Sequence, residues 1–189
     1  MRATGSMVSI SKFGINADSW FTRNSAAYTR AVEIIFGIVW LIDGQLKFAP
    51  GLPAVFSSMV ASAAQGQPQW LHGWFAFWSS VSMANPQFFV YFVGLCELAL
   101  GFALVFGFMR KTAFTLGAVL SLLIWAVPEG FGGPYGPSST DIGTGIIYAI
   151  LLLMLLGYSA MFMNSRYTLD SVIRRRVKWW STFSDFRRK

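Results

Sequence analysis

Residues 30–48 read RAVEIIFGIVWLIDGQLKF. This stretch is almost long enough by itself to cross a membrane as a helix, which needs about 20 mostly apolar residues. Pro50 and Pro53 follow it and end the helix. Three more apolar tracts occur along the chain, at about 86–109, 112–127 and 141–163. The sequence therefore predicts an all-α membrane protein, a bundle of four transmembrane helices whose first span covers about 26–48.

The positive charges set the predicted orientation of these spans. Of the fifteen Lys and Arg residues, only Lys47 lies outside three segments, which are the chain before residue 31, Arg110 with Lys111, and the chain after residue 165. Cytoplasmic loops next to membrane spans carry the excess of Lys and Arg. We therefore expect both termini in the cytoplasm and the connections at roughly 50–86 and 128–140 on the outer side.

The composition supports a membrane protein and argues against several other classes. The chain is 54% hydrophobic and 12% charged, whereas soluble domains carry about 25% charged residues. The formal net charge of +7 lies beside the apolar tracts, where anionic lipid headgroups account for it better than nucleic acid does. Cys96 and His72 are the only residues of their types. No internal disulfide, metal site or haem site is predicted from this chain alone.

The predicted organisation has three parts, which are a cytoplasmic segment at 1–25, a transmembrane domain at 26–163 and a basic cytoplasmic tail at 164–189. Between the first two spans, residues 50–85 are too polar to cross a bilayer. They contain Trp70, Trp74 and Trp78, a density typical of rings at the depth of lipid headgroups. We therefore expect a short Trp-rich helical insertion on the outer face.

Two carboxylates lie inside predicted spans, where ionisable groups are costly and mark candidate functional sites. Glu33 belongs to the first span and Glu97 to the second. A rise of about 1.5 Å per residue puts them about 13 and 18 Å from the inner face. At these similar depths they suit proton transfer, because burial favours the protonated form. The alternative is a structural role, such as an ion pair between Glu33 and Arg30 one turn earlier.

Lys47 is the leading candidate for contact with an anion, because it is the only basic side chain expected on the outer side. It shares a helix face with Asp43, four residues earlier. Trp40 and Glu33 fall on nearly the same face, so we expect this stripe to face protein. The alternative is an ion pair between Asp43 and Lys47 that only shields both charges.

Gly37 and Gly44 are seven residues apart in the first span, and Gly94 and Gly101 have the same spacing in the second. Small residues at helix interfaces allow membrane helices to approach closely. We therefore expect these glycines to serve helix packing.

The glycine- and proline-rich loop at 128–137, PEGFGGPYGP, carries a second group of candidates. Glu129 stands among aromatic residues that can enclose a ligand, namely Trp125, Phe131 and Tyr135. Asp141 follows Ser138 in the pattern Ser-x-x-Asp, which predicts a cap for the fourth span, and it can also join the same site. His72 can reach this site from the insertion, although a single histidine is more often structural than catalytic.

Several stretches resemble one known family. Residues 30–48, with their closing Gly-x-x-Lys, resemble the first span of the DoxX-like superfamily of small four-helix membrane proteins. Glu97-Leu-Ala-Leu-Gly101 resembles the Glu-x-x-x-Gly of its second span. The stretch WAVPEGFGGPYGPSSTDIGTG at 125–145 is similar to the DoxD branch, which includes the membrane subunit of thiosulfate:quinone oxidoreductase.

The resemblance implies a membrane subunit in the cell membrane of a prokaryote, which passes electrons from thiosulfate or a related reduced sulfur compound to quinone. It also implies a second subunit or further copies of this chain, with membrane lipid around them. The quinone is a bound substrate, and Lys47, Glu97, Glu129 and Asp141 are the residues that match the family. With the residues above, the predicted site has three groups: catalytic Glu97, Glu33 and Glu129; substrate-binding Lys47, Asp43, His72, Asp141 and Tyr135; and quinone-binding Trp40, Trp125 and Phe131.

Two other functions fit the same sequence. One is a non-catalytic membrane scaffold or assembly factor that holds a partner enzyme, in which the buried carboxylates only specify helix packing. The other is a transporter for a small solute or ion. The transporter is favoured less, because the sequence lacks the inverted repeat that many transporters have.

Overall fold

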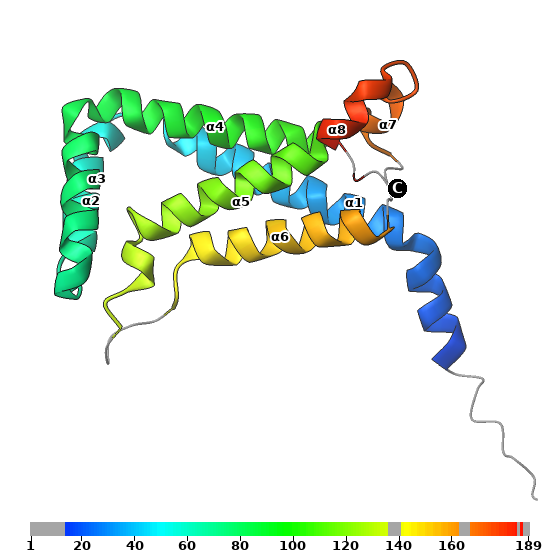
Figure 1. Ribbon diagram of the computed structural model, residues 1–189, viewed down its shortest axis with the longest axis horizontal. Helices are drawn as coiled ribbons and strands as arrows, with labels where there is room; N and C mark the ends of the chain where they lie inside the picture. Colours follow the sequence, from blue (N-terminus) through cyan, green and yellow to red (C-terminus); the bar gives the residue numbers. More distant parts are fainter. Residues whose placement is uncertain (1–13, 136–140, 163–166, 185, 187–189) are drawn as a thin grey trace, which may run out of the picture.

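The computed structural model describes residues 14–135, 141–162, 167–184 and 186, and within them the regular structure is helical (Figure 1). Four long helices of this described part lie side by side, and they are α1 (Gly14–Leu46), α4 (Pro86–Phe106), α5 (Arg110–Ala126) and α6 (Thr144–Phe162). The predicted all-α class is confirmed for the described residues.

Three segments of these long helices are long and apolar enough to cross a membrane, and they are Arg23–Leu46, Pro86–Phe106 and Thr144–Met161. The outward face of α4 carries large apolar side chains that are more than half exposed, namely Phe88, Phe92, Leu95, Phe102 and Phe106. An apolar stripe of this extent on a surface marks contact with lipid or with another protein. The length and composition of these segments support the predicted membrane character.

Two helices begin at places that differ from the predicted spans. α1 extends back to Gly14, because a helix can continue beyond its apolar part. α6 begins at Thr144, three residues after the predicted start of the fourth span, because Asp141 and Gly143 form a turn before it. Ser138, the first residue of the predicted cap, lies outside the described residues.

The bundle is built from two helix pairs, α1 with α4 and α5 with α6. In the first pair, glycines face one another across the contact. A Cβ atom added to Gly37 would lie 2.9 Å from the carbonyl oxygen of Gly101, and one added to Gly44 would lie 3.0 Å from that of Gly94. Any larger residue would push the helices apart. The prediction that these glycines serve close packing is confirmed.

Buried apolar side chains fill the space where the two pairs meet. Phe36 of α1 packs edge-on against Tyr148 of α6, with ring centroids 5.0 Å apart. Around Phe36 lies a set of side chains that are each at most 7% exposed. We call this set the apolar layer, and it consists of Phe36, Leu100, Leu104, Phe114 and Leu152.

Between α1 and α4 the chain forms a helical hairpin, made of α2 (Leu52–Ala63), the short turn η1 (Gln69–Leu71) and α3 (His72–Ala84). The hairpin lies across one end of the bundle, roughly perpendicular to the long helices (Figure 1). The indole of Trp74 donates a hydrogen bond of 2.9 Å to the carbonyl of Ala126. The amide of Gln67 donates one of 2.8 Å to the carbonyl of Gly130. These bonds anchor the hairpin to the chain at and after the end of α5, and we call this end of the bundle the hairpin end.

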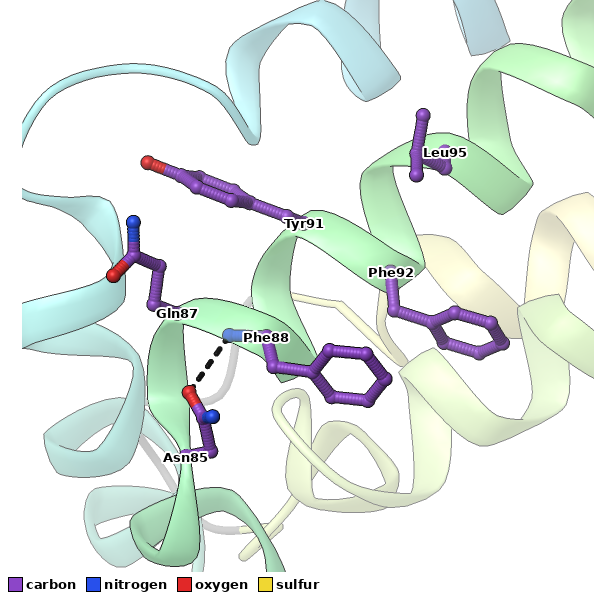
Figure 2. A pocket seen from close by; sticks show the side chains of 6 residues that line it. All are labelled: Asn85, Gln87, Phe88, Tyr91, Phe92 and Leu95. Carbon is purple, nitrogen blue, oxygen red and sulfur yellow. Dashed lines mark hydrogen bonds between the residues drawn. The ribbon is translucent and has the colours of Figure 1, made fainter.

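α4 begins directly after the hairpin, at a capped turn. The side-chain oxygen of Asn85 accepts a hydrogen bond of 3.0 Å from the amide of Phe88 (Figure 2), which satisfies one of the free amides at the helix start. Figure 2 shows the rings of Phe88 and Phe92 on one side of the helix and Tyr91 pointing the other way. Tyr91 stacks on Phe48, with ring centroids 5.2 Å apart. The shallow groove in Figure 2 is lined by Asn85 and α4 residues, and it continues the exposed apolar face of α4.

The opposite end of the bundle carries the carboxy-terminal elements, which are α7 (Leu169–Ile173), η3 (Lys178–Trp180) and α8 (Ser181–Ser184) (Figure 1). The buried carboxylate of Asp170 holds them against the turn between α4 and α5. It accepts hydrogen bonds from the amides of Met109 and Arg110, at 2.8 and 2.9 Å. It also accepts one of 2.8 Å from the indole of Trp180. We call this end the terminal end.

The glycine contact between α1 and α4 yields a first prediction. Gly101→Ala puts a methyl group 2.8 Å from the side chain of Leu41 and 2.9 Å from the carbonyl of Gly37. Overpacking of this kind costs about 1–3 kcal/mol, so we expect the purified variant to unfold more readily in a thermal or denaturant titration in detergent.

Gly157→Ala is the matched control, because nothing lies within 4 Å of a Cβ atom at this position of α6. Alanine favours a helix over glycine by up to about 1 kcal/mol, so this variant should be as stable as the original protein or slightly more stable. Equal losses in the two variants would contradict the close α1–α4 contact.

Candidate functional site

A cavity of about 230 Å³ lies between the two helix pairs, near the hairpin end. All four long helices contribute to its wall, together with the chain segments that follow α1 and α5. We call it the polar cavity, and its lining residues are Trp40, Asp43, Lys47, Glu97, Ser121, Ile124, Glu129, Thr144, Gly145 and Tyr148. Five of the eleven residues predicted for the site thus line one cavity.

The centre of the polar cavity is an ion pair between Lys47 and Glu97. The Lys47 Nζ atom lies 3.0 Å from Glu97 Oε2. Glu97 is 1% exposed, whereas the side chain of Lys47 is 27% exposed. The cavity therefore holds a buried carboxylate whose counter-ion stands at the edge.

The ion-pair partner of Lys47 is Glu97 of α4, whereas the shared helix face indicated Asp43. Lys47 lies just after the end of α1, where its amide donates to the carbonyl of Gly44 in a turn. The turn directs its side chain across to α4. Lys47 Nζ also approaches Asp43, but there it contacts the backbone carbonyl, at 3.4 Å. In place of the alternative ion pair between the side chains of Asp43 and Lys47, the structure shows a pair between Lys47 and Glu97.

Glu33 lies in a different polar cluster, toward the terminal end. Its Oε2 atom accepts a hydrogen bond of 2.8 Å from Arg30, and its Oε1 atom accepts bonds of 3.1 and 2.5 Å from Arg110. Arg30 also donates to the carbonyl of Leu104, at 2.7 Å. The side chains of Arg30, Glu33 and Arg110 are all at least 93% buried. The structural alternative, a pair with Arg30, is therefore present, and Arg110 completes it.

The expectation that Glu33 and Glu97 lie at similar depths is wrong. Because Gly37 meets Gly101 and Gly44 meets Gly94, Glu97 of the antiparallel α4 lies level with Leu41 of α1. Leu41 is eight residues beyond Glu33, which corresponds to about 12 Å along the helix. The apolar layer lies between the two carboxylates, so they do not share a site.

Trp40 is the predicted quinone contact that lines the polar cavity. It is 1% exposed, and its ring packs against Tyr148 with a centroid distance of 5.5 Å. Its buried Nε1 atom has no hydrogen-bond partner within the described residues. A buried donor without an acceptor costs free energy, so this indole is available to a ligand that carries an acceptor.

Trp125 and Phe131, the other two predicted quinone contacts, pack together beneath the hairpin. Their ring centroids lie 5.2 Å apart, and Phe131 also contacts the rings of Trp74 and Phe75. The indole of Trp125 donates to the carbonyl of Ile142, at 2.7 Å. The structure separates these two residues from the lining of the polar cavity.

Glu129 caps the start of α6, a role that the sequence pattern assigned to Asp141. Glu129 Oε2 accepts a hydrogen bond of 2.9 Å from the amide of Gly145, in the first turn of α6. Asp141 accepts one of 2.8 Å from Gly143, which forms a local turn. The residue before α6 is Gly143, which has φ 93° and no side chain, so the cap comes from Glu129 across the loop. A carboxylate at a helix amino terminus is stabilised as an anion.

His72 and Tyr135 lie outside the lining of the polar cavity. The ring Nε2 atom of the exposed His72 lies 3.2 Å from the carbonyl of Gln67. The hydroxyl of Tyr135 donates to the carbonyl of Phe131, at 2.7 Å. His72 thus makes a contact within the hairpin, and Tyr135 makes one within the loop after α5.

Five lining residues were not among the predicted ones, and three of them have polar side chains, namely Ser121, Thr144 and Tyr148. Tyr148 of α6 and Asp43 of α1 both line the polar cavity. Thr144 and Tyr148 are four residues apart in an otherwise apolar helix and so share one face, which is the signal that would have identified them. Ser121 donates to the carbonyl of Gly117, at 2.8 Å, and nothing in its sequence context distinguishes it.

The charge balance of the polar cavity restricts its ligands. Asp43, Glu97 and Glu129 bring three carboxylates, and Lys47 brings one ammonium. Since Lys47 is already paired with Glu97, an added anion would meet more negative than positive charge. The arrangement can exchange protons and can donate hydrogen bonds to a neutral acceptor. Within the described residues, no three His, Cys, Asp or Glu side chains are grouped to hold a metal ion.

Comparisons of the chain with protein-family models, with curated proteins and with solved structures find no match.

The ion pair leads to a second prediction. Lys47→Met removes the counter-ion of Glu97 and leaves a buried carboxylate uncompensated, which costs on the order of 3 kcal/mol. The free energy of unfolding of the purified variant in detergent should fall by this amount.

The double variant Lys47→Met with Glu97→Gln tests the cause of that loss. Removing the charge of Glu97 should restore much of the stability, so the two effects should be far from additive. Additive losses would show that the two side chains do not interact.

Proposed function

We propose that this protein is a four-span membrane protein with both termini in the cytoplasm and the hairpin on the outer side. The three long apolar segments support spanning. α5 is 17 residues long, about 25 Å at 1.5 Å per residue, and so nearly matches the hydrocarbon core of about 30 Å. Arg110 and Lys111 lie at the terminal end together with the basic tail, and cytoplasmic faces carry this excess of positive charge.

Thiol labelling tests this orientation. In a Cys96→Ala background, Gln69→Cys should react with a membrane-impermeant thiol reagent added to whole cells, because the hairpin faces outward. Arg175→Cys is the control from the terminal end and should react only after the membrane is opened. The reverse pattern would contradict the proposed orientation.

Within this frame we propose that the protein is the membrane subunit of a quinone-linked oxidoreductase, and that the polar cavity binds the quinone head group. The observation that carries this proposal is the buried Trp40 indole, which has no acceptor in the described part of the chain and lines the same cavity as the Lys47–Glu97 pair. A quinone carbonyl can accept hydrogen bonds from both the indole and the ammonium. Reduction of a quinone also takes up two protons with two electrons. The neighbouring carboxylates can pass these protons to the quinone.

The gap between α1 and α6 supports entry of the quinone from the bilayer. These two helices belong to different pairs, and near the cavity the rings of Phe36, Trp40 and Tyr148 bridge them. Toward the terminal end, the same gap holds an apolar groove of about 520 Å³, lined in part by Val32 and Leu155. A groove of this kind suits the apolar tail of a membrane quinone.

The electron donor of the proposal is thiosulfate or a related reduced sulfur compound, and this part rests on the resemblance to the DoxD branch. Because Lys47 is paired and the cavity is rich in carboxylates, we propose that the sulfur anion is oxidised outside the polar cavity, on a second subunit. The contribution of this chain is then to bind and orient the quinone and to exchange protons with it.

Quinone binding tests the proposed site. Trp40→Phe keeps the aromatic ring and removes only the N–H donor. Loss of one hydrogen bond corresponds to about 0.5–1.5 kcal/mol, so the Kd of the purified protein for a ubiquinone or menaquinone analogue should rise roughly 2- to 10-fold.

Trp78→Phe is the matched control. The Nε1 atom of Trp78 is also buried without a partner in the described residues, but Trp78 belongs to the hairpin and does not line the polar cavity. Its variant should bind the analogue normally. The absence of any quinone, both in lipid extracts of the purified protein and in these titrations, would reject the proposed site.

A second candidate function is a membrane scaffold that holds a partner enzyme. The observation in its favour is the exposure of large apolar side chains on the hairpin, where Trp70 is 80% and Phe77 is 59% exposed. Such a surface fits a partner protein as well as lipid headgroups. Stable co-purification of a partner with a protein that binds no quinone would favour this function.

A further inference from the structure

We propose that the polar cavity is a proton-binding site with access from one side only: Glu97 exchanges its proton with water at the hairpin end, and the apolar layer closes the path to the terminal end. The inference rests on the proposed orientation across a membrane. It does not depend on the identity of the ligand in the cavity.

The exposure of the cavity residues changes along its depth. At the bottom, Trp40, Glu97 and Ser121 are each at most 1% exposed. At the edge, Lys47 is 27% exposed, and Thr144 is exposed. The volume of about 230 Å³ is room for about seven water molecules at about 30 Å³ each. The cavity is therefore a recess that opens toward the hairpin end.

The charged groups around Glu97 form a chain toward that opening. Lys47 and Asp43, at the end of α1, line the cavity together with Glu97, and Tyr148 lines it from α6. Glu129 lies in the segment after α5, half-buried, and its carboxylate reaches the first turn of α6 at the edge of the cavity. The remaining titratable neighbour is Cys96, and α5 contributes Ser121 and Ile124, which do not titrate. Carboxylates and water can thus pass a proton between the edge and Glu97.

The proton balance of this exchange is simple. A proton from water at the hairpin end binds the Glu97 carboxylate, which becomes a neutral carboxyl, and its ion pair with the Lys47 ammonium is lost. Release of the proton to the same water restores the pair. No electron or second reactant is involved in the exchange itself.

The other direction is closed by two successive barriers. The apolar layer occupies the distance of about 12 Å between the level of Glu97 and that of Glu33, and each of its side chains is at most 7% exposed. Beyond it, both oxygens of Glu33 are held by arginine side chains. Since a guanidinium stays protonated in proteins, this cluster fixes the charge of Glu33 and offers no free site for a travelling proton.

Thiol accessibility tests the sidedness in the full-length protein. In the Cys96→Ala background we compare Ser121→Cys, on the wall of the cavity, with Ala118→Cys, one turn nearer the terminal end and 3% exposed. The reagent is a cationic, membrane-impermeant methanethiosulfonate, which the acidic cavity should attract. It is added to right-side-out and to inside-out vesicles, with Gln69→Cys and Arg175→Cys as markers of the two sides.

The expected result is that Ser121→Cys reacts from the same side as Gln69→Cys and from that side only, whereas Ala118→Cys reacts from neither side. Reaction of Ser121→Cys from the side of Arg175→Cys, from both sides or from neither overturns the inference. Reaction of Ala118→Cys from the side of Arg175→Cys also overturns it.

Infrared spectroscopy of proteoliposomes provides a second measurement that needs no thiol reagent inside the cavity. The band of the protonated Glu97 carboxyl should follow the pH on the hairpin side and ignore the pH on the other side, and Glu97→Gln identifies the band by removing it. A band that follows the pH of the terminal side contradicts the inference. Neither measurement uses a quinone, so failure of quinone binding and failure of one-sided access give different results.

Discussion

The close contact between Gly94 of α4 and Lys47 is the constraint on which the rest of the structure depends. A Cβ atom at Gly94 would lie 2.8 Å from the Cβ of Lys47, so only glycine lets the lysine pass across α4 to Glu97, one turn further along. The same approach of α1 to α4, continued at Gly44, Gly37 and Gly101, sets the register of the helix pair. That register puts a buried carboxylate within reach of an ammonium and leaves the polar cavity where the second pair meets the first. The packing of the helices and the chemistry of the site thus have one cause.

The two buried carboxylates of the bundle have partners of different kinds, and the difference suits different roles. Glu33 is held by the guanidinium groups of Arg30 and Arg110, with bonds to both of its oxygens. These groups remain charged and hold a fixed geometry. Glu97 has one ammonium on a flexible stem, and that ammonium is partly exposed. Proton uptake by Glu33 would leave two buried guanidinium groups without their anion, whereas proton uptake by Glu97 would release a single lysine that can turn to solvent. The cluster at the terminal end is therefore structural, and the pair at the hairpin end can change state.

Much of the fold follows from the sequence. Long apolar tracts predict membrane helices, and glycines seven residues apart predict close helix contacts, without any knowledge of the tertiary structure. The selection of Lys47 as a site residue also came from the sequence, through the distribution of charge. Its partner could not be predicted, since that depends on the turn after Leu46 and on the register between α1 and α4. The cap that Glu129 supplies to α6 could not be predicted for a related reason. Gly143, directly before α6, has no side chain that could cap the helix, so the cap comes from across the loop. The sequence pattern around Asp141 indicates only a cap from a residue close in sequence.

The charges of the polar cavity also connect the proposed ligand with the proposed proton access. Three carboxylates around one ammonium disfavour a bound anion, because it would meet more negative than positive charge in a buried space. A neutral ligand that accepts hydrogen bonds and then takes up protons avoids this difficulty, because it adds no charge on entry. If the apolar layer prevents exchange with the terminal side, the protons that reach such a ligand come from the compartment at the hairpin end. Electrons from a donor oxidised in that same compartment would then accompany the protons, and reduction of the ligand would move no net charge across the membrane.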